Sequence, residues 1–206
     1  MEELMGLCKE PKENGWRNLV NDKRKKIYIE TKKSFRGFNM MRATGPIEHQ
    51  ALDCFRVIEQ GGVAGEWDET AEEGYLISKQ GVNAYELYNR SKRVMIVEGR
   101  DFVMDCLFQK YEDGTIVHAS CSNHDKDDVV PIRKGVTRAT TPIGGWILMP
   151  DPENPNRTNA CLIVEIDFKG YMPDFAITTA FSMQGYMIDK LRKYIPKFLD
   201  KNAHLL

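Results

Sequence analysis

A chain of 206 residues is long enough for one domain with a large core, and 42% apolar with 29% charged residues excludes a disordered protein. The formal net charge of -1 provides no overall field to attract nucleic acid, so we expect no nucleic-acid partner. The five cysteines include no C-x-x-C pair, which favours free thiols and a cytoplasmic location. The charged N-terminal residues lack the apolar core of a signal peptide, and no run approaches the 18 apolar residues of a membrane span.

The N-terminal part of the chain predicts a short helix followed by a β-hairpin. Residues 1–24 are charged and mixed, which predicts a short helix that leads to Trp16. The β-prone runs 27–29 and 38–41 flank the polar segment 34–37, as in a hairpin.

A second helix is predicted immediately after the hairpin. Gly45-Pro46 is expected to end the sheet, with Pro46 in the first helical turn, Thr44 as a possible cap and Gly61-Gly62 as the stop. The apolar residues at helical spacing are Ile47, Ala51, Cys54, Phe55 and Ile58.

The remainder of the chain predicts a large antiparallel meander and a long terminal helix. Asp113-Gly114 and Gly144-Gly145 are expected to be turns between strands. The predicted strands are 75–79, 84–88, 101–111, 115–120, 136–141, 146–149 and 160–168. The terminal helix begins after Pro173 and carries an apolar stripe through Ile177, Phe181, Ile188, Leu191, Ile195 and Phe198. Residues 1–206 therefore form one α+β domain with a sheet of about nine strands.

The terminal helix lacks the polar face of an ordinary surface helix. No charged residue lies between Asp174 and Asp189, and apolar side chains surround much of the helix. Such a helix is covered by the sheet, by another chain, or by a ligand or membrane. A sheet of this size curls and leaves interior volume, and the small residues of the helix leave room. The ten methionines suit an adaptable wall, so we favour a ligand.

Six short motifs occur in order along the chain: Trp67-Asp68, Arg100-Asp101-Phe102-Val103, Lys134 to Ala139, Gly145 to Pro150, Ile166 to Gly170 and Met172-Pro173. Their order and spacing are more specific than any one of them. Through these motifs the chain, from about Trp16 to Ile195, resembles the START (steroidogenic acute regulatory protein-related lipid transfer) domain family. The resemblance implies a helix-grip fold, in which a curved sheet wraps a C-terminal helix and an internal hydrophobic tunnel holds one lipid.

The resemblance also implies a lid, formed by the C-terminal helix and by an omega loop, here Asn123 to Arg133. We expect Val129, Val130 and Pro131 to form the part of this loop that contacts a membrane interface transiently. Each buried methylene contributes about 0.8 kcal/mol, so a lipid leaves a bilayer very slowly unless a closed apolar tunnel receives it.

One position departs from the family pattern. Many members carry an arginine six residues after the first arginine of the Arg-Asp-Phe motif, and this chain has Cys106 there. With Met104 and Phe108 on the same strand face, this part of the wall is apolar. A partner carboxylate is then expected to face solvent, and Glu86 and Glu98 are the candidates. Arg100 and Asp101 are interpreted as architectural.

The expected tunnel lining combines this apolar face with polar side chains that could contact a lipid. Its residues are Tyr85, Met104, Cys106, Phe108, His118, Arg138, Thr178, Phe181, Ser182 and Met183. Buried Tyr and Arg usually find protein partners, so a structural role competes with a ligand-binding role for several of them.

Other chemistries find little support in the residue patterns. His118, Cys121 and His124 have a spacing close to that of a zinc site, but along a strand Cys121 would face away from both histidines, so we expect no metal. No signature of a catalytic cysteine and no phosphate-binding glycine loop is present, and we expect no cofactor.

The sequence therefore predicts a cytoplasmic, monomeric protein that binds one lipid and transfers or senses it, transiently at membranes, and that is not an enzyme. A phospholipid is slightly favoured over a sterol or fatty acyl chain. The alternatives are a hydrolase or cyclase on the same scaffold, acting on an acyl or polyketide substrate, and an interaction module with a filled core.

Overall fold

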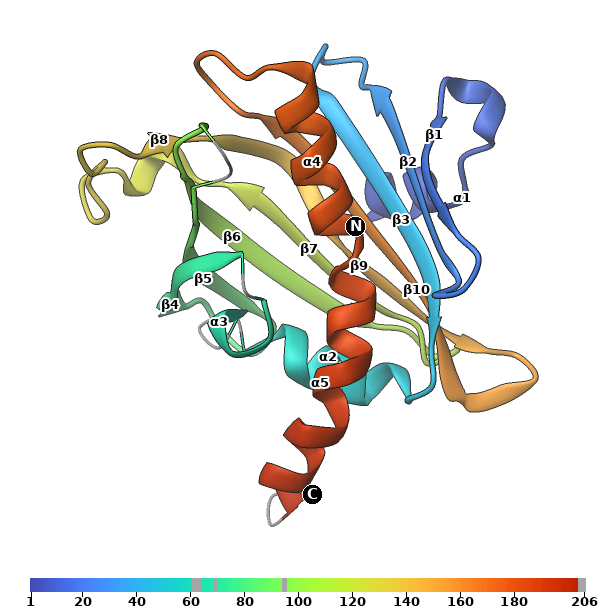
Figure 1. Ribbon diagram of the computed structural model, residues 1–206. Coiled ribbons are helices and arrows are strands. Elements are labelled where there is room, and N and C mark those ends of the chain that lie inside the picture. The colour runs from blue at the N-terminus through green and yellow to red at the C-terminus, as the bar shows by residue number, and fades with distance from the viewer. Residues whose placement is uncertain (61–63, 69, 94–95, 204–206) are drawn as a thin grey trace.

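The computed structural model describes residues 1–60, 64–68, 70–93 and 96–203 (Figure 1). The helices are α1 (Glu2–Lys9), α2 (Ala51–Ile58), α3 (Ala64–Trp67), α4 (Asp174–Gly185) and α5 (Met187–Lys201), with 3-10 turns η1 (Lys12–Asn14) and η3 (His124–Lys126). The strands are β1 (Arg17–Asp22), β2 (Ile27–Lys33), β3 (Asn39–Ile47), β4 (Ala71–Lys79), β5 (Ala84–Ser91), β6 (Arg100–Lys110), β7 (Ile116–Ser122), β8 (Thr137–Arg138), β9 (Thr140–Asp151) and β10 (Asn154–Asp167).

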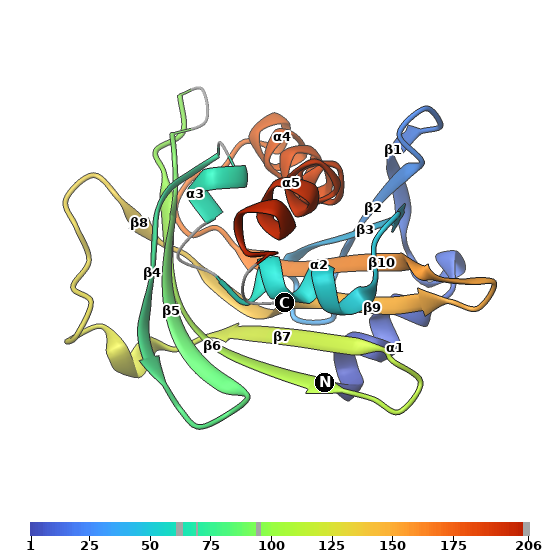
Figure 2. The same cartoon turned by 90° about the horizontal axis from the view of Figure 1, so that it is seen from below.

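The strands form one curved sheet in the order β1-β2-β3-β10-β9-β7-β6-β5-β4, while the short β8 pairs in parallel with β6. All other pairs are antiparallel. Seen from below, α4 and α5 lie between a wall of β4 to β6 and a wall of β1 to β3 (Figure 2). The α+β class and the sheet wrapped around C-terminal helices agree with the sequence-based prediction.

The main core lies on the concave face of the sheet, where α2, α4 and α5 pack. Phe55 of α2, Phe181 of α4 and Leu191 of α5 are almost completely buried there. The stripe on α5 is conventional, because Ile188, Leu191, Ile195 and Phe198 face inward at helical spacing.

A second, smaller core lies on the convex face beneath α1. Leu4 packs with Trp16, Val117 and Ile163, and the last two alternate along β7 and β10 with residues of the main core. Arg42 fixes the end of α1, because its guanidinium donates to the carbonyl oxygens of Leu7 and Glu10, both at 2.8 Å. The central strands are therefore covered on both faces.

The N-terminal half of the chain differs from the prediction in two places. The short helix before Trp16 is present as α1, but residues 17–22 form the edge strand β1, which was not predicted. Strand β3 continues through Gly45 and Pro46 to Ile47, so α2 begins only at Ala51. Beyond Thr44 the pairing of β3 with β2 has ended, and a proline without an N–H group is tolerated on such an edge.

The prediction of a turn at Gly144-Gly145 was wrong, because both glycines lie inside β9. The single terminal helix is divided at Tyr186 into α4 and α5. The hairpin at 34–37 and the turn at Asp113-Gly114 are confirmed. The expected stop of α2 at Gly61-Gly62 lies outside the described residues.

No helix in the described part of the chain is long and apolar enough to cross a membrane.

Candidate ligand-binding site

A pocket of about 200 Å³ lies on the concave side of the sheet, between β5 to β10 and the helices α2, α4 and α5. Most lining side chains are apolar, and the polar ones are neutral apart from one aspartate. The lining residues are Val57, Ile58, Trp67, Asp68, Leu87, Asn89, Phe102, Met104, His118, Ser120, Thr141, Gly144, Gly145, Trp146, Leu162, Val164, Ile166, Gln184 and Met187. We call this space the inner cavity.

The charge of Asp68 is compensated within the wall of the inner cavity. Its Oδ1 atom lies 2.9 Å from Nζ of Lys190 on α5 and accepts two hydrogen bonds from Thr70. The inner cavity therefore offers a ligand no unpaired charge among the described residues that line it.

A second space of about 100 Å³, the upper hollow, lies between α4, the beginning of β6 and the end of β10. It shares Phe102, Ile166 and Gln184 with the inner cavity, so these three side chains separate the two spaces. Arg100 borders the upper hollow, but its guanidinium donates to the carbonyl oxygens of Glu98, Phe168 and Lys169. Burial lowers the pKa of this guanidinium, while the carbonyl groups solvate it. Arg100 is architectural, as the sequence indicated.

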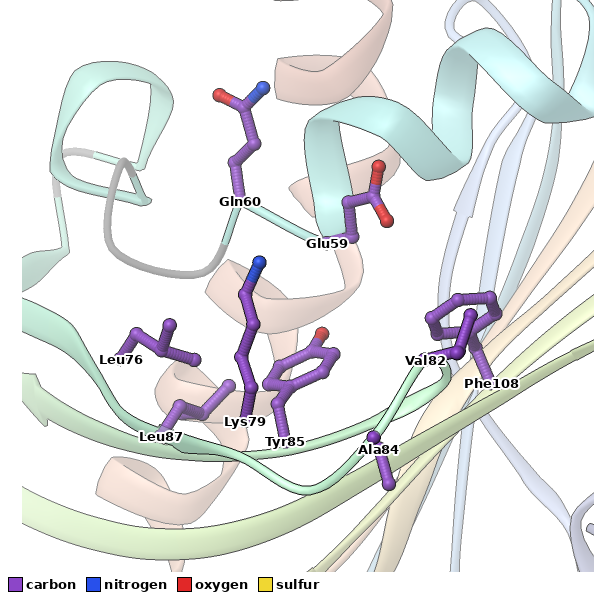
Figure 3. Close-up of a pocket in the computed structure, with 10 residues that line it drawn as sticks. Glu59, Gln60, Leu76, Lys79, Val82, Ala84, Tyr85, Leu87 and Phe108 are labelled. Carbon is purple, nitrogen blue, oxygen red and sulfur yellow. The ribbon is translucent and has the colours of Figure 1, made fainter.

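The third space is an open pocket of about 660 Å³ where the β4–β5 hairpin meets the end of α2 (Figure 3). It is lined by Tyr85, Leu87 and Phe108 on the sheet side, with Glu59 and Gln60 above them. We call this third space the outer pocket. Leu87 also lines the inner cavity, so the two spaces adjoin each other.

The predicted lining residues of β5, β6 and β7 lie on the concave face. Met104 and His118 line the inner cavity, whereas Tyr85 and Phe108 line the outer pocket. Cys106 packs between these groups against Tyr85 and Leu87, is 2% exposed, and lines none of the three spaces. Burial raises the pKa of its thiol, so this part of the wall is uncharged at neutral pH.

The predicted residues of α4 do not all reach the same space. Phe181 and Met183 border the upper hollow. Thr178 instead borders a groove between α4 and the strands β1 and β2, and Phe181 contacts this groove as well. Ser182 is half-buried and lines neither space. Helix α4 therefore lies between the mostly apolar upper hollow and a groove with charged residues of β1 and β2 in its lining.

Arg138 lies away from the cavity, on the outer face of the sheet. Its Nε atom donates to Oδ1 of Asp101 at 2.9 Å, and its Nη2 atom donates to the carbonyl oxygen of Val130 at 2.9 Å. Asp127 provides a second carboxylate partner. Asp101 also accepts a hydrogen bond from Tyr88 at 3.3 Å. This network attaches the segment 123–136 to β5 and β6.

The predicted lid loop packs on the outer face of β4 to β6, opposite the side that α4 covers (Figure 2). Val130 is buried against Tyr88 and Val103, whereas Val129 and Pro131 are exposed. Contact of this loop with a membrane stays a prediction.

The orientation expected for Glu86 was only half right. Its side chain points away from the cavity but is 5% exposed, because Lys126 covers it with an Nζ–Oε1 distance of 3.0 Å. Ser78 also donates to it, and together these partners lower the pKa of the Glu86 carboxyl. Glu98 is exposed.

Four polar residues of the inner cavity were not predicted from the sequence. Asn89, Ser120, Thr141 and Gln184 line the inner cavity, and each has counterparts of the same type elsewhere on the surface. For Asn89 and Ser120, the strand alternation counted from Tyr85 and His118 would have placed them on the concave face.

The three residues considered for zinc binding are separated. His118 is buried, Cys121 is exposed, and His124 contacts Thr140 with an Nε2–Oγ1 distance of 3.1 Å. Within the described ranges, no three metal-ligating side chains come together.

A largely apolar pocket between helices and a curved sheet, with a few polar groups in its wall, is typical of a protein that binds a small molecule. The START domain family model matches residues 2–189, and the chain belongs to this family. It is 26% identical over 194 residues to mouse StAR-related lipid transfer protein 5, covering 90% of this chain and 88% of that protein.

Two solved human structures share the fold. Human StAR-related lipid transfer protein 5 has a TM-score of 0.83 at 22% identity and covers 96% of this chain and 93% of its own. Human STARD10 has a TM-score of 0.81 at 16% identity, covering 100% and 83%. The architecture is therefore the helix-grip fold that the resemblance implied.

Proposed function

We propose that this protein binds one neutral lipid, such as a sterol, between its C-terminal helices and the sheet and transfers it between membranes. The main support is the inner cavity, which is lined mostly by apolar side chains. Its one charged lining residue, Asp68, is paired with Lys190. Family membership and the mouse relative named as a lipid transfer protein support a lipid as the ligand.

The charges around the cavity favour a neutral lipid over the phospholipid that the sequence slightly favoured. A phosphate group needs donors or cations that are free to contact it. Arg100 is occupied by three carbonyl groups, and Lys190 is occupied by Asp68, while Lys92 at the upper hollow is exposed to solvent. A phosphate buried in the inner cavity would therefore have no free cation to compensate its charge among the described lining residues, whereas a hydroxyl group needs none.

The volumes indicate that binding requires rearrangement. Sites for drug-sized ligands have volumes of about 300–1,000 Å³, and the inner cavity has about 200 Å³. The upper hollow adds space only if Phe102, Ile166 or Gln184 moves. Rotamer changes of the aromatic Phe102 and the flexible Gln184 would connect the two spaces for a lipid, while the fold stays the same.

We infer that the membrane contacts the end of the molecule where the upper hollow lies. Ile96, Tyr171 and Phe175 are exposed there, at 70%, 86% and 48%, and the adjacent Val97 and Met172 line the hollow. Exposed aromatic and aliphatic side chains of this kind partition into a bilayer interface. The five free thiols support a reducing compartment such as the cytosol.

The enzyme alternative requires a general base or nucleophile in the cavity. His118 is the lining residue best suited to that role, but burial lowers the pKa of its imidazole to about 4, which makes it a weak base at neutral pH. This supports binding over catalysis.

The proposal is tested by incubating the purified full chain with vesicles that contain dehydroergosterol and labelled phosphatidylcholine. Native mass spectrometry should detect a monomer with one sterol, and the protein should accelerate sterol transfer from donor to acceptor vesicles. Preferential capture of phosphatidylcholine, the release of a chemically altered lipid, or a dimer with no bound lipid would contradict it.

A further inference from the structure

The wall of the inner cavity contains a histidine with one unused ring nitrogen. Nε2 of His118 lies 2.7 Å from the hydroxyl oxygen of Tyr85. Nδ1 of His118 is buried and has no hydrogen-bond partner within the described part of the chain. The His118 side chain is 7% exposed and lines the inner cavity. A buried polar atom without a partner is uncommon and costs about 1–3 kcal/mol.

The backbone fixes the position of this imidazole. His118 lies in the middle of β7, opposite Phe108 of β6 and Trp146 of β9. Tyr85 reaches it from β5, across β6, and is itself 9% exposed. The two side chains therefore project from the strands on either side of β6 in one hydrogen-bonded sheet, which holds a binding group in place.

The protonation state limits what the pair can bind. The imidazole lies in apolar surroundings and is neutral at pH 7, with its pKa lowered to about 4 by desolvation. A neutral imidazole has one donor and one acceptor nitrogen, and the tyrosine hydroxyl can take either role. Rotation of the Tyr85 hydroxyl thus determines whether Nδ1 of His118 donates or accepts.

A hydroxyl group is the ligand group that fits both states, because it also donates and accepts. We propose that Nδ1 of His118, oriented by Tyr85, binds the hydroxyl group of the neutral lipid. This assignment rests on the proposed function and adds the polar end of the ligand to it. A carboxylate or phosphate can also accept a hydrogen bond from the neutral imidazole, but its charge would have no free cation beside it among the described lining residues of the inner cavity.

The Tyr85–His118 pair lies at the boundary between the outer pocket and the inner cavity, and this position sets the orientation of the ligand. Tyr85 lines the outer pocket, whereas His118 lines the inner cavity. The apolar body of the lipid would extend away from His118, past Met104 and Phe102 towards the upper hollow. The hydroxyl group would lie nearest the outer pocket.

The test compares two ligands that differ only in the hydroxyl group. Bound dehydroergosterol is displaced by cholesterol or by cholest-5-ene, which lacks the 3-hydroxyl. We expect wild-type protein to prefer cholesterol by about tenfold or more, since the deoxy ligand leaves Nδ1 unpartnered. His118→Phe should bind both ligands with similar affinity. His118→Gln, which keeps a donor and an acceptor, should retain part of the preference.

Cys121→Ser is the matched control, because Cys121 lies on the same strand as His118, is exposed and lines none of the three spaces. It should retain the full preference. If His118→Phe fails to fold, the ¹⁵N chemical shift of Nδ1 in wild-type protein gives an independent readout. Cholesterol should shift that resonance and cholest-5-ene should not.

The outcomes separate this inference from the proposed function. Equal affinity of wild-type protein for both steroids would overturn the role of His118 and leave lipid binding intact, as would an undiminished preference in a folded His118→Phe variant. Binding of phosphatidylcholine with no displacement by either steroid would overturn the neutral-lipid function, and this inference with it.

Discussion

The backbone of Gly145 passes so close to His118 that a Cβ atom at position 145 would lie 2.0 Å from the His118 carbonyl oxygen. It would also lie 2.9 Å from Cα of Ala119, and Gly145 has a φ of +148°. Both atoms belong to the neighbouring strand, which cannot move aside without breaking the β7–β9 pairing. Gly145 therefore determines the position of the strand that carries the cavity histidine.

We expect Gly145→Ala to destabilise the protein by more than about 2 kcal/mol, because backbone must move in a strained conformation. Gly144→Ala is the matched control, since its Cβ would meet a Thr141 methyl group at 3.2 Å and Gly144 does not have a positive φ. Gly144→Ala should lower the free energy of unfolding distinctly less than Gly145→Ala does. Urea denaturation of both variants measures the difference, and equal losses would show that the close approach is not the cause.

Gly144-Gly145 also shows where sequence reasoning failed. Two adjacent glycines usually indicate a turn, and only the neighbouring strand reveals that they permit close packing inside β9. Strand β1 was missed for a similar reason, since an exposed edge strand of Arg17, Asn18 and Asn21 has no apolar alternation. The hairpin and the inward stripe of α5 were predictable because their signals are local.

The candidate site was only partly accessible from the sequence. Alternation along β6 correctly grouped Met104, Cys106 and Phe108 on one face. The sequence could not show that Arg138 lies outside the tunnel, because its carboxylate partner, Asp101, is 37 residues away along the chain. The hydrogen bond between Tyr85 and His118 spans 33 residues, so it depends on strand order and not on spacing.

The buried ion pair of Asp101 and Arg138 should dominate the stability of the outer face. Both side chains are almost fully buried, with a second hydrogen bond of 3.2 Å from Nη2 to Oδ2. Asp101→Asn leaves the guanidinium partly uncompensated and should cost about 3–5 kcal/mol. Glu73→Gln, which removes the exposed partner of Arg133, should cost less than about 1 kcal/mol. Similar unfolding free energies for the two variants would contradict the importance of the buried pair.

His118 should make the stability depend on pH in the mildly acidic range. Its pKa is about 4 in the folded protein and near 6.5 when unfolded, so below pH 6.5 the unfolded chain binds a proton that the folded protein does not. Stability from this residue is complete above pH 6.5 and decreases as the pH falls towards 4. The loss between pH 7 and pH 5 should be about 2 kcal/mol.

The variant His118→Gln lacks this titration and isolates it from the carboxylates. Glu10, Glu86 and Asp151 also have lowered pKa values, but their stabilisation is lost at lower pH and is common to both proteins. The unfolding free energy of the wild type minus that of the variant should therefore decrease by about 2 kcal/mol from pH 7 to pH 5. A difference that stays constant from pH 7 to pH 5 would mean that the imidazole is solvated.

Position 106 tests the character of the concave wall. Cys106→Arg places a large cation in the apolar cluster with Tyr85 and Leu87, directly behind the walls of the inner cavity and the outer pocket. We expect reduced lipid loading together with a loss of stability. Cys121→Arg, on the exposed side of β7, should change neither property. Unchanged lipid uptake by Cys106→Arg would show that the cation is accommodated without a change in the cavity wall.

The two C-terminal helices are attached to the sheet in different ways. Helix α5 is held by Lys190 to Asp68 and by Arg192, whose Nε donates to the carbonyl oxygen of Pro46 at 2.6 Å. Within the described ranges, no side-chain hydrogen bond or ion pair connects α4 to the sheet. At the junction of the two helices, the Tyr186 hydroxyl donates to Asp22 at 3.1 Å. We expect α4 to open about this junction when lipid enters.

Tyr186→Phe removes the contact with Asp22 and keeps the ring on which Lys25 packs at 4.7 Å. Weakening the closed state by about 1 kcal/mol should accelerate sterol transfer between vesicles roughly fivefold. Tyr194→Phe is the control, because it removes a similar hydrogen bond, to Glu66 at 2.6 Å, from α5 instead. If Tyr194→Phe accelerates transfer and Tyr186→Phe does not, the lipid leaves past α5, on the side of the outer pocket, and α4 is not the lid.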